Sequence, residues 1–502
     1  MRRLLAPLLL AASPALLAGQ ARTLPPRLAE FDRYVTQAAR DWKIPGLAIA
    51  VIKDDSVVLA KGYGVLDLAR PDPVTEHTRF AIGSTTKAMT SAALGILVDQ
   101  GKLRWDDRVI DYLPDFRMYD PYVTRELTIR DLLTHRSGLG STDLLWARAD
   151  YTLPEMMRRL RFVTPASSFR SQWSYQNVVY AIGGEIVAKV SGMPWEEFIR
   201  TRLFAPLGMS ESEPLVAGIL AKPNVATPHA ELGDSVRQVP VRSTDAVAPA
   251  GSVWSSVADM AKWMRFILDS GRVGSTRLLS PRTFSELVSP QIRADQATYP
   301  ALTLVHPHIF AYGLGWFVQD YQGETVWMHT GSIDGMSALI GLLPDRKAGI
   351  YVLANLDHAE LRHALMYRLF DLYAGRAPRD WSKELLALFA PPVASAAAAS
   401  TTPAARPAAV PPSLPLEAYA GSYVDSTYGG VDVSLADGAL RARFGREELG
   451  GLEPFNYESF RAVGPPPARS RTLMTFLTDG TGRVTAVRVF GVVFNRARST
   501  TR

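Results

Sequence analysis

The sequence predicts an α+β fold, in which an antiparallel sheet flanked by helices carries an inserted helical region and a small all-β barrel-like domain follows. Apolar runs typical of strands lie near both ends of the first domain, and segments with helical spacing fill the region between them. A segment rich in Pro, Ala, Ser and Thr then precedes a last stretch of alternating strands and turns. This order of elements favours a sheet made from both ends of the first domain.

Strands of the first domain are expected in four apolar runs. Residues 47–52 and 57–61 form a hairpin around an Asp-Asp pair, and residues 336–343 and 350–354 lie near the other end of the domain. Their composition is typical of strands that are buried on at least one face.

The last segment has the turn chemistry of hairpins. Residues 431–435 and 440–444 alternate between apolar and polar side chains around one Asp-Gly pair, and a second Asp-Gly pair separates residues 473–477 from 484–494. Asp-Gly is a preferred turn between antiparallel strands. We therefore expect residues 414–502 to form a small antiparallel barrel or curled sheet.

The N-terminus is typical of a secretory signal peptide. Arg2 and Arg3 precede an apolar run over residues 4–17, and small residues near Ala21 offer a cleavage site. The run is too short and too interrupted by proline to span a membrane, although an uncleaved anchor is the alternative. We expect an exported protein, periplasmic or secreted, with no stable membrane span after the signal is removed.

Composition then divides the chain into four parts. Residues 1–21 are the expected signal peptide, and residues 22–390 form the first domain. Residues 391–413 are nearly all Pro, Ala, Ser and Thr, which predicts an extended linker. Residues 414–502 are the β domain.

Charge and cysteine content exclude several classes of function. The formal net charge is +6 over 502 residues and no run of Lys or Arg appears, so no nucleic acid partner is implied. Without cysteine the chain has no disulfide, no thiolate metal site and no cysteine nucleophile. His306 and His308 have no third ligand at a suitable spacing, so we interpret them as loop residues and expect no metal and no cofactor.

The first catalytic candidate is Ser84-Thr85-Thr86-Lys87, at the start of a predicted helix. Residues three apart on a helix share a face, so Lys87 should lie one turn above Ser84. An ammonium and the positive end of a helix dipole both favour an alkoxide. Alone, such a pattern is usually a capping serine followed by an exposed lysine, but two further motifs accompany it.

The second motif is Tyr175-Gln176-Asn177, which opens a helix predicted to run to Val190. A phenol at this junction can project into a cleft, and a nearby Lys87 could lower its pKa from about 10 towards the working pH. That would suit Tyr175 to general base and acid catalysis.

The third motif is His329-Thr330-Gly331-Ser332, which we expect to end a short edge strand over residues 325–328. A glycine at such a strand end lets a backbone N–H approach a substrate carbonyl. The predicted oxyanion hole is the backbone N–H of Ser84 and that of Ser332.

Together these motifs resemble those of the serine beta-lactamase and penicillin-binding protein-like superfamily, which carries S-x-x-K and K-T-G. The Tyr-x-Asn motif is similar to that of its class C beta-lactamase-like branch, and no Ser-Asp-Asn triplet is present, which disfavours the class A arrangement. Further similar stretches are Leu132-Leu133-Thr134-His135-Arg136-Ser137-Gly138-Leu139, Pro249-Ala250-Gly251-Ser252, Tyr312-Gly313-Leu314-Gly315-Trp316 and Pro344-Asp345-Arg346. The C-terminal segment resembles the lipocalin-like domain appended to some peptidases of the superfamily.

The resemblance implies roles for the motif residues. Ser84 would be the nucleophile, Lys87 its proton-relay partner and Tyr175 the base and acid. Asn177 would bind the substrate amide, and His329, Thr330 and Gly331 would line the site. His135 is interpreted as a structural neighbour of the site.

The histidine at position 329 limits the substrate. A lysine there would be a permanent cation for the carboxylate of a beta-lactam, whereas histidine is largely neutral above roughly pH 6.5. We therefore expect at most a weak beta-lactamase.

The resulting hypothesis is an exported serine hydrolase that acts through a Ser84 acyl-enzyme. We favour a peptidase on small or D-residue-containing peptides, because the appended barrel accompanies peptidase activity in similar proteins. The alternatives are a carboxylesterase of the class C branch and, from another class, a non-catalytic penicillin-binding or scaffolding protein. The expected partners are a small-molecule or peptide substrate and, through the C-terminal domain, further copies of the chain in a homo-oligomer.

Overall fold

The computed structural model describes residues 24–149, 151–389, 410–464 and 471–497. The predicted signal peptide and residues 391–409 of the predicted linker lie outside these ranges.

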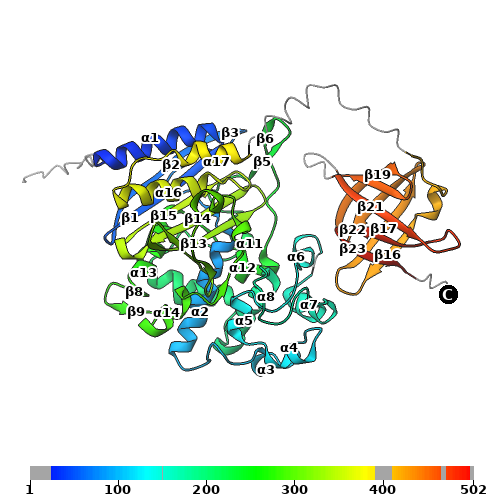
Figure 1. Ribbon diagram of the computed structural model, residues 1–502, viewed down its shortest axis with the longest axis horizontal. Coiled ribbons are helices and arrows are strands. Elements are labelled where there is room, and N and C mark those ends of the chain that lie inside the picture. The colour runs from blue at the N-terminus through cyan, green and yellow to red at the C-terminus, as the bar shows by residue number, and fades with distance from the viewer. Residues whose placement is uncertain (1–23, 150, 390–409, 465–470, 498–502) are drawn as a thin grey trace, which may run out of the picture.

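The first domain is built on a nine-stranded antiparallel sheet, which confirms the predicted α+β class (Figure 1). In sheet order the strands are β10 (Ile292–Arg293), β11 (Phe310–Tyr312), β12 (Phe317–Tyr321), β13 (Glu324–Ile333), β14 (Met336–Leu343), β15 (Ala348–Ala354), β1 (Gly46–Lys53), β2 (Ser56–Asp67) and β3 (Arg70–Pro73). Strands from the two ends of the domain meet where β1 pairs with β15, Ala50 opposite Tyr351. The four strands predicted in this domain are all present.

Helices cover both faces of the sheet, because apolar side chains of β1 point alternately to one face and to the other. Leu47, Ile49 and Val51 belong to one hydrophobic cluster, with α1 (Pro26–Asp41), α16 (Leu361–Ala374) and α17 (Trp381–Phe389). The intervening side chains of β1 face the other cluster, with α2 (Thr86–Asp99), α8 (Asn177–Ser191) and α13 (Val257–Leu268). Successive strand residues point to opposite faces, so one strand serves two cores.

The inserted region between β3 and β10 is mainly helical. Its remaining helices are α3 (Val109–Tyr112), α4 (Pro121–Glu126), α5 (Ile129–Leu133), α6 (Leu144–Ala147), α7 (Leu153–Arg159), α9 (Trp195–Ile199), α10 (Ala205–Leu207), α11 (Val216–Ile219), α12 (Ala248–Gly251) and α14 (Pro281–Val288), and α15 (Leu302–Val305) follows β10. Three short strand pairs join them: β4 (Phe80–Ala81) with β7 (Trp254–Ser255), β5 (His229–Leu232) with β6 (Ser235–Gln238), and β8 (Arg272–Val273) with β9 (Thr276–Arg277).

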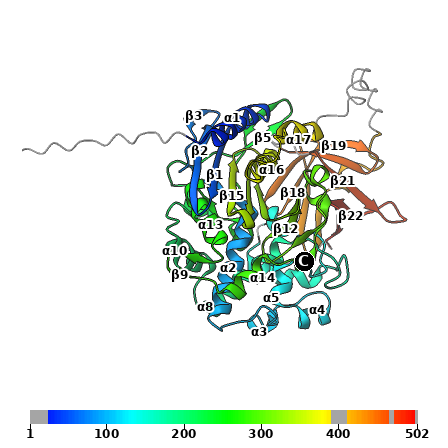
Figure 2. The same cartoon turned by 60° about the vertical axis from the view of Figure 1, so that its left-hand side comes forward.

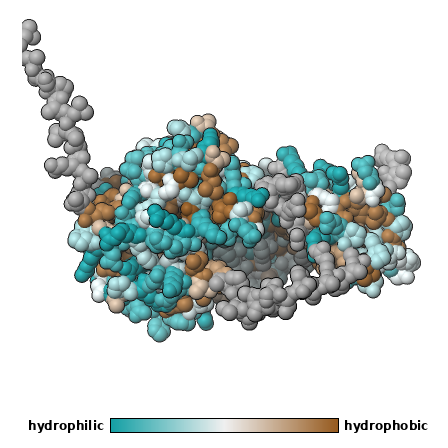
Figure 3. Space-filling model, turned by 90° about the horizontal axis from the view of Figure 1, so that it is seen from above, coloured by the Kyte–Doolittle hydropathy of each residue, from teal (hydrophilic) through white to brown (hydrophobic). Residues whose placement is uncertain are grey.

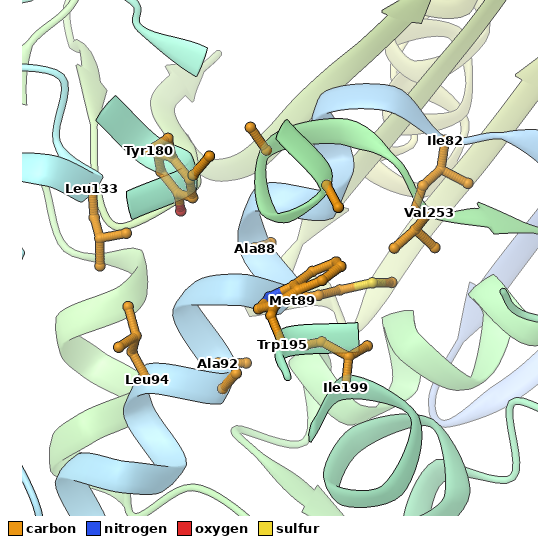
Figure 4. Packing of buried hydrophobic residues seen from close by; sticks show 14 of the residues in the cluster. Ile82, Ala88, Met89, Ala92, Leu94, Leu133, Tyr180, Trp195, Ile199 and Val253 are labelled. Carbon is orange, nitrogen blue, oxygen red and sulfur yellow. The ribbon is translucent and has the colours of Figure 1, made fainter. Parts of the chain in front are cut away.

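Helix α2 lies in the middle of this region. Every residue from Thr86 to Leu97 is buried, as expected for a helix whose whole circumference is packed. Figure 4 shows Met89 and Ala92 of α2 among side chains of neighbouring helices, including Tyr180 and Trp195, and all four belong to one cluster.

The prediction of a short edge strand before His329 was wrong. Strand β13 pairs with both β12 and β14 up to Met328 and continues to Ile333. The His329–Ser332 motif therefore lies within the strand rather than beyond its end, and it pairs with β14 alone. The apolar pattern stops at Met328, but pairing with β14 extends the strand through Ser332, opposite Ser337.

The C-terminal domain is a closed eight-stranded barrel. This confirms the first of the two forms expected for residues 414–502, a small antiparallel barrel. Its strands are β16 (Gly421–Asp425), β17 (Gly429–Ala436), β18 (Ala439–Phe444), β19 (Glu447–Asn456), β20 (Ser459–Val463), β21 (Arg471–Thr478), β22 (Val484–Val489) and β23 (Val492–Arg496). The stretch predicted as one strand over 484–494 turns at Phe490, whose φ is 53°. Buried side chains such as Tyr419, Phe460 and Phe476 pack against one another inside the barrel.

The barrel lies beside α6 and α7 of the first domain (Figure 1), and Figure 2 shows its strands β18, β19, β21 and β22 from a second side. On the face seen in Figure 3, hydrophilic and hydrophobic residues are interspersed over both domains. No helix within the described ranges is long and apolar enough to cross a bilayer.

Close packing of α8 on α12 depends on a glycine. A Cβ added at Gly184 would lie only 2.1 Å from Cγ of Pro249. The next residue of α12, Ala250, presents its carbonyl to the side chain of Lys87. The contact between α8 and α12 therefore helps to position the backbone carbonyl that binds Lys87.

We expect Gly184→Ala to destabilise the protein, although alanine is the better helix former. Overpacking against Pro249 should cost about 1–3 kcal/mol, more than the gain of about 1 kcal/mol that alanine brings to a helix interior. Urea unfolding should show the loss. Lys189→Ala, at an exposed position of the same helix, is the control and should stay within about 0.5 kcal/mol of the wild type. A Gly184→Ala variant as stable as the wild type would contradict this account of the packing.

Candidate active site

A pocket of about 530 Å³ lies where the start of α2, the helical region and β13 meet. It contains the nucleophile candidate and most of the other motif residues. The residues that line it are Ser84, Asp143, Trp173, Tyr175, Asn177, Thr298, Tyr299, Pro300, Phe317, His329, Thr330, Ser332, His358, Glu360, Arg362 and Phe389. A larger cavity of about 1070 Å³, beside α8 and the barrel, contains none of the motif residues.

Ser84 and Lys87 lie as their spacing predicts. Ser84 belongs to a 3₁₀ turn (Gly83–Thr85) that leads into α2, and it is partly exposed to the pocket. The side chain of Lys87 points back along the helix and donates to Ser84 Oγ at 3.1 Å. Its other hydrogen bonds go to Asn177 Oδ1 at 2.7 Å and to the Ala250 carbonyl at 2.8 Å.

The environment of Lys87 favours the neutral amine. Lys87 is fully buried, and its hydrogen-bond acceptors are a hydroxyl, an amide and a backbone carbonyl. Burial holds the pKa of Lys87 well below its usual value, and the more distant carboxylate of Asp143 opposes this in part. A neutral lysine next to Ser84 Oγ can accept the hydroxyl proton.

Tyr175 lies on the other side of Lys87. The Nζ of Lys87 lies 4.5 Å from the centre of the Tyr175 ring, so the amine faces the ring. The hydroxyl of Tyr175 is buried and has no hydrogen-bond partner among the residues described. Burial raises the pKa of Tyr175 well above its usual value, and the neighbouring Ser84 hydroxyl lowers it only in part.

The expectation that Lys87 lowers the pKa of Tyr175 towards neutrality is therefore wrong. It presupposed a charged lysine beside an exposed phenol, whereas both groups are buried and burial favours the neutral form of each. The arrangement gives a neutral amine and a protonated phenol on the two sides of the Ser84 hydroxyl.

Asn177 connects Lys87 to a carboxylate that the motifs did not reveal. The Nδ2 of Asn177 donates to Asp143 Oδ1 at 3.1 Å, and the Nε1 of Trp146 donates to the same oxygen at 2.7 Å. Asp143 immediately precedes α6, and no spacing rule in the sequence ties it to Asn177. The link is set by tertiary structure.

Two facing glycines bring together the proposed oxyanion-hole donors. A Cβ at Gly83 would lie 2.8 Å from the backbone nitrogen of Ser332, and a Cβ at Gly331 would lie 3.1 Å from that of Ser84. Any side chain at either position would separate the two backbone segments. The N–H groups of Ser84 and Ser332 thus lie at the same end of the pocket, where they can face one carbonyl oxygen.

A buried arginine, which the motifs also did not indicate, supports this end of β13. Arg362 Nη1 donates to the Gly331 carbonyl at 2.7 Å and to Ser332 Oγ at 2.9 Å, and its Nη2 donates to Glu360 at 2.7 Å. Although burial opposes it, the charges of His363 and Arg362 hold the pKa of Glu360 below its usual range. Through its contacts with Gly331 and Ser332, Arg362 holds the part of β13 that carries the second of the proposed oxyanion-hole donors.

His329 lines the pocket but is almost completely buried. Its side chain is buried, its Nε2 lies 2.9 Å from the hydroxyl of Tyr312, and its Nδ1 lies 2.6 Å from the Thr330 carbonyl. Burial, helped by Lys87, lowers the pKa of His329 to about 3. The ring is therefore neutral at working pH. The side-chain hydroxyl of Thr330 forms a hydrogen bond with the hydroxyl of Tyr299 at 2.9 Å.

His135 packs against Tyr175 and binds the backbone of the next residue, Gln176. Its ring centre lies 4.3 Å from that of Tyr175, and its Nδ1 accepts the backbone N–H of Gln176 at 3.0 Å. This is the structural position inferred from the sequence. His306 adopts a left-handed conformation at the end of α15 (φ 50°) and is not part of the pocket lining.

Comparisons with known proteins identify a family model or relatives for each of the two domains. The model of the Beta-lactamase family matches residues 31–374, and that of a domain of unknown function (DUF3471) matches residues 405–499. The unguisins hydrolase ungD of Aspergillus violaceofuscus is 32% identical over 446 residues, which cover 82% of this chain and 78% of the relative. Penicillin-binding protein 4 of Amycolatopsis lactamdurans is 32% identical over 62% of this chain and 81% of its own length.

A solved structure shares the fold of both domains. The octameric penicillin-binding protein homologue from Pyrococcus abyssi covers 93% of this chain and 100% of its own length, with a TM-score of 0.62 and 21% sequence identity. Because the family model covers more than half of the chain and the Ser-Lys pair has the geometry of an activated nucleophile, the chain belongs to the Beta-lactamase family and is a serine hydrolase.

Proposed function

We propose that this protein is a peptidase that cleaves small or D-residue-containing peptides through an acyl-enzyme on Ser84. One observation carries the proposal: the Ser84 hydroxyl lies between a buried amine that favours its neutral form and a buried phenol that stays protonated. The first group can accept a proton, and the second can donate one.

In the proposed reaction Ser84 Oγ attacks the substrate carbonyl while Lys87 takes the hydroxyl proton. The N–H groups of Ser84 and Ser332 stabilise the oxyanion, and such donors are typically worth about 10²–10³ in rate each. Tyr175 then protonates the leaving nitrogen, and the proton held by Lys87 restores Tyr175. Attack by water on the acyl-enzyme returns Ser84 to its starting state.

The protonated phenol favours amides over esters as the natural substrate. An amine leaves only after it has been protonated, whereas a stabilised alkoxide or phenolate can leave without a proton. The aromatic side chains of Trp173, Tyr299 and Phe317 in the pocket lining suit an apolar residue of a peptide. The unguisins hydrolase that resembles this chain over most of its length supports a hydrolytic reaction.

Beta-lactams fit less well, because the neutral His329 offers no cation to their carboxylate. A carboxylesterase is the second candidate, since an activated serine between the same groups would also accept an ester. A chromogenic panel of D- and L-aminoacyl p-nitroanilides, p-nitrophenyl esters and nitrocefin separates the three activities.

We further propose export, on the strength of the apolar N-terminal run after Arg2 and Arg3. N-terminal sequencing of the mature protein tests it. Assembly into a homo-oligomer through the barrel is likewise a proposal, which light scattering of the purified protein tests.

Ser84→Ala should abolish both turnover and covalent labelling by a fluorophosphonate, because no other group would carry the acyl chain. The fold should remain, since Ser84 lies inside the 3₁₀ turn and neither this turn nor α2 has a side-chain capping hydrogen bond that the substitution would remove. Ser171→Ala, at an exposed loop position, is the control and should label like the wild type. Persistent hydrolysis by Ser84→Ala would refute the mechanism.

Tyr175→Phe should harm amide cleavage more than ester cleavage. Loss of general acid assistance should lower kcat/KM on a p-nitroanilide by about 10²–10⁴, and much less on a p-nitrophenyl ester, whose phenolate leaves unprotonated. Equal losses on the two substrates would show that Tyr175 does not protonate the leaving group.

Asp143→Asn should shift the acid limb of the pH profile of kcat/KM to lower pH. Activity requires neutral Lys87, so it falls as the pH drops through the pKa of Lys87, and the Asp143 carboxylate raises that pKa. The neighbouring His135 and His329 are neutral because their pKa values are depressed, and Tyr175 is protonated, so none of them reverses the sign. The exposed Asp72→Asn is the control. A shift to higher pH would exclude Lys87 as the base.

A further inference from the structure

The loop that carries Asp143 is held from two sides. On the active-site side, Thr142 Oγ1 donates to Gln176 Oε1 at 2.8 Å and Asp143 accepts from Asn177. We call residues 141–149 the Asp143 loop. Its only helix is α6, which has four residues, and so short a helix has little stability of its own. The loop therefore depends on what packs against it.

Its other side faces one end of the barrel. The barrel strands run up and down, so alternate turns lie at the same end. The turns at Ser426–Tyr428, at Gly445–Glu447 and at Phe490 form one end, which we call the docking end. The turn at Asp437 lies at the opposite end.

Polar contacts join the docking end to the Asp143 loop and to α7. The hydroxyl of Tyr428 donates to the Ser141 carbonyl at 3.4 Å. Arg148 Nη1 pairs with Glu447 Oε1 at 2.5 Å, and its guanidinium lies 4.5 Å from the ring of Phe490.

Arg159 of α7 makes a further connection. Its Nη1 donates to the carbonyls of Ser426 and Thr427 at 2.9 and 3.1 Å. The barrel thus contacts the Asp143 loop near its start through Tyr428 and near its end through Glu447. It also contacts α7, the helix that follows the loop.

Apolar packing continues the same interface. Ala149 is buried and belongs to the hydrophobic cluster of the barrel, although it is part of the first domain. A Cβ at Gly429 would lie 2.1 Å from the hydroxyl of Tyr151, so this glycine admits the tyrosine against the barrel. The barrel core therefore extends onto the last residue of the Asp143 loop, and the barrel also contacts Tyr151 beyond it.

We propose that the C-terminal barrel is a positioning element of the active site, which holds the Asp143 loop in place so that Asp143 can orient Asn177 beside Lys87. The barrel touches no reacting atom, and it acts through the loop. This inference rests on the serine hydrolase chemistry proposed above. It gives the second domain a role in the reaction of the first.

The test is a barrel variant, Tyr428→Phe with Glu447→Gln, which removes two contacts to the loop and leaves the catalytic domain unaltered. We expect kcat/KM on a p-nitroanilide to fall about tenfold, mainly in kcat, since small displacements of catalytic groups cost up to about 10²-fold. The acid limb should move to lower pH, as in Asp143→Asn, because the carboxylate moves away from Lys87. Asp437→Asn, which removes a carboxylate at the opposite end of the barrel, is the matched control and should behave as the wild type.

A double-mutant cycle separates positioning from general damage. In the Asp143→Asn background the barrel variant should cost less than about twofold, because both changes act through the same carboxylate. Multiplicative losses, an unshifted pH profile or an equal loss in Asp437→Asn would overturn the proposal. If the combined variant folds poorly, Tyr428→Phe and Glu447→Gln are measured separately. Each single variant is then compared with the wild type and with Asp437→Asn in kcat/KM and in pH profile.

Failure of this inference is distinguishable from failure of the proposed function. If the wild type is not labelled at Ser84 by a fluorophosphonate, the proposed function is wrong. If the wild type is labelled and active but the barrel variant matches it in rate and pH profile, the positioning role alone is wrong.

Discussion

A buried amine with neutral hydrogen-bond partners is the constraint on which the active site depends. Lys87 is fully buried, and its three acceptors come from three different elements: the turn before α2, the start of α8 and the short helix α12. Removing a lysine from water disfavours its charge. The same burial that depresses the pKa of Lys87 suits its amine to the proposed role of base for Ser84.

The surrounding structure keeps these elements close. Gly184 lets α12 approach α8, and the facing Gly83 and Gly331 let the nucleophile turn approach β13. Arg362 then fixes the end of β13 by binding the Gly331 carbonyl and the Ser332 hydroxyl. Each feature is a contact at short range between segments distant in sequence, and together they set the shape of the pocket.

Much of this architecture could be predicted from the sequence, because local patterns encode it. Helical spacing placed Lys87 one turn above Ser84, and alternation with Asp-Gly turns identified the barrel hairpins. Motif similarity then brought Tyr175 and Asn177 to the same pocket.

What could not be predicted depends on tertiary contact. Asp143 and Arg362 carry no local signature, since one acts through Asn177 and the other through backbone carbonyls. The extent of β13 was missed because pairing with β14, rather than its own apolar pattern, extends it through Ser332. The pKa of Tyr175 could not be judged without knowing that its hydroxyl is buried.

The contacts between barrel and catalytic domain have a consequence for how this interface evolves. Ser141, Ser426 and Thr427 take part through their carbonyl oxygens, which every amino acid carries. Substitution at these positions leaves the acceptors in place, so the sequence requirement falls on the donors Arg159 and Tyr428. Relatives can therefore differ in sequence at these acceptor positions in both domains while the barrel keeps the same contacts with the catalytic domain. Sequence identity in these segments would then understate how well the two surfaces fit each other.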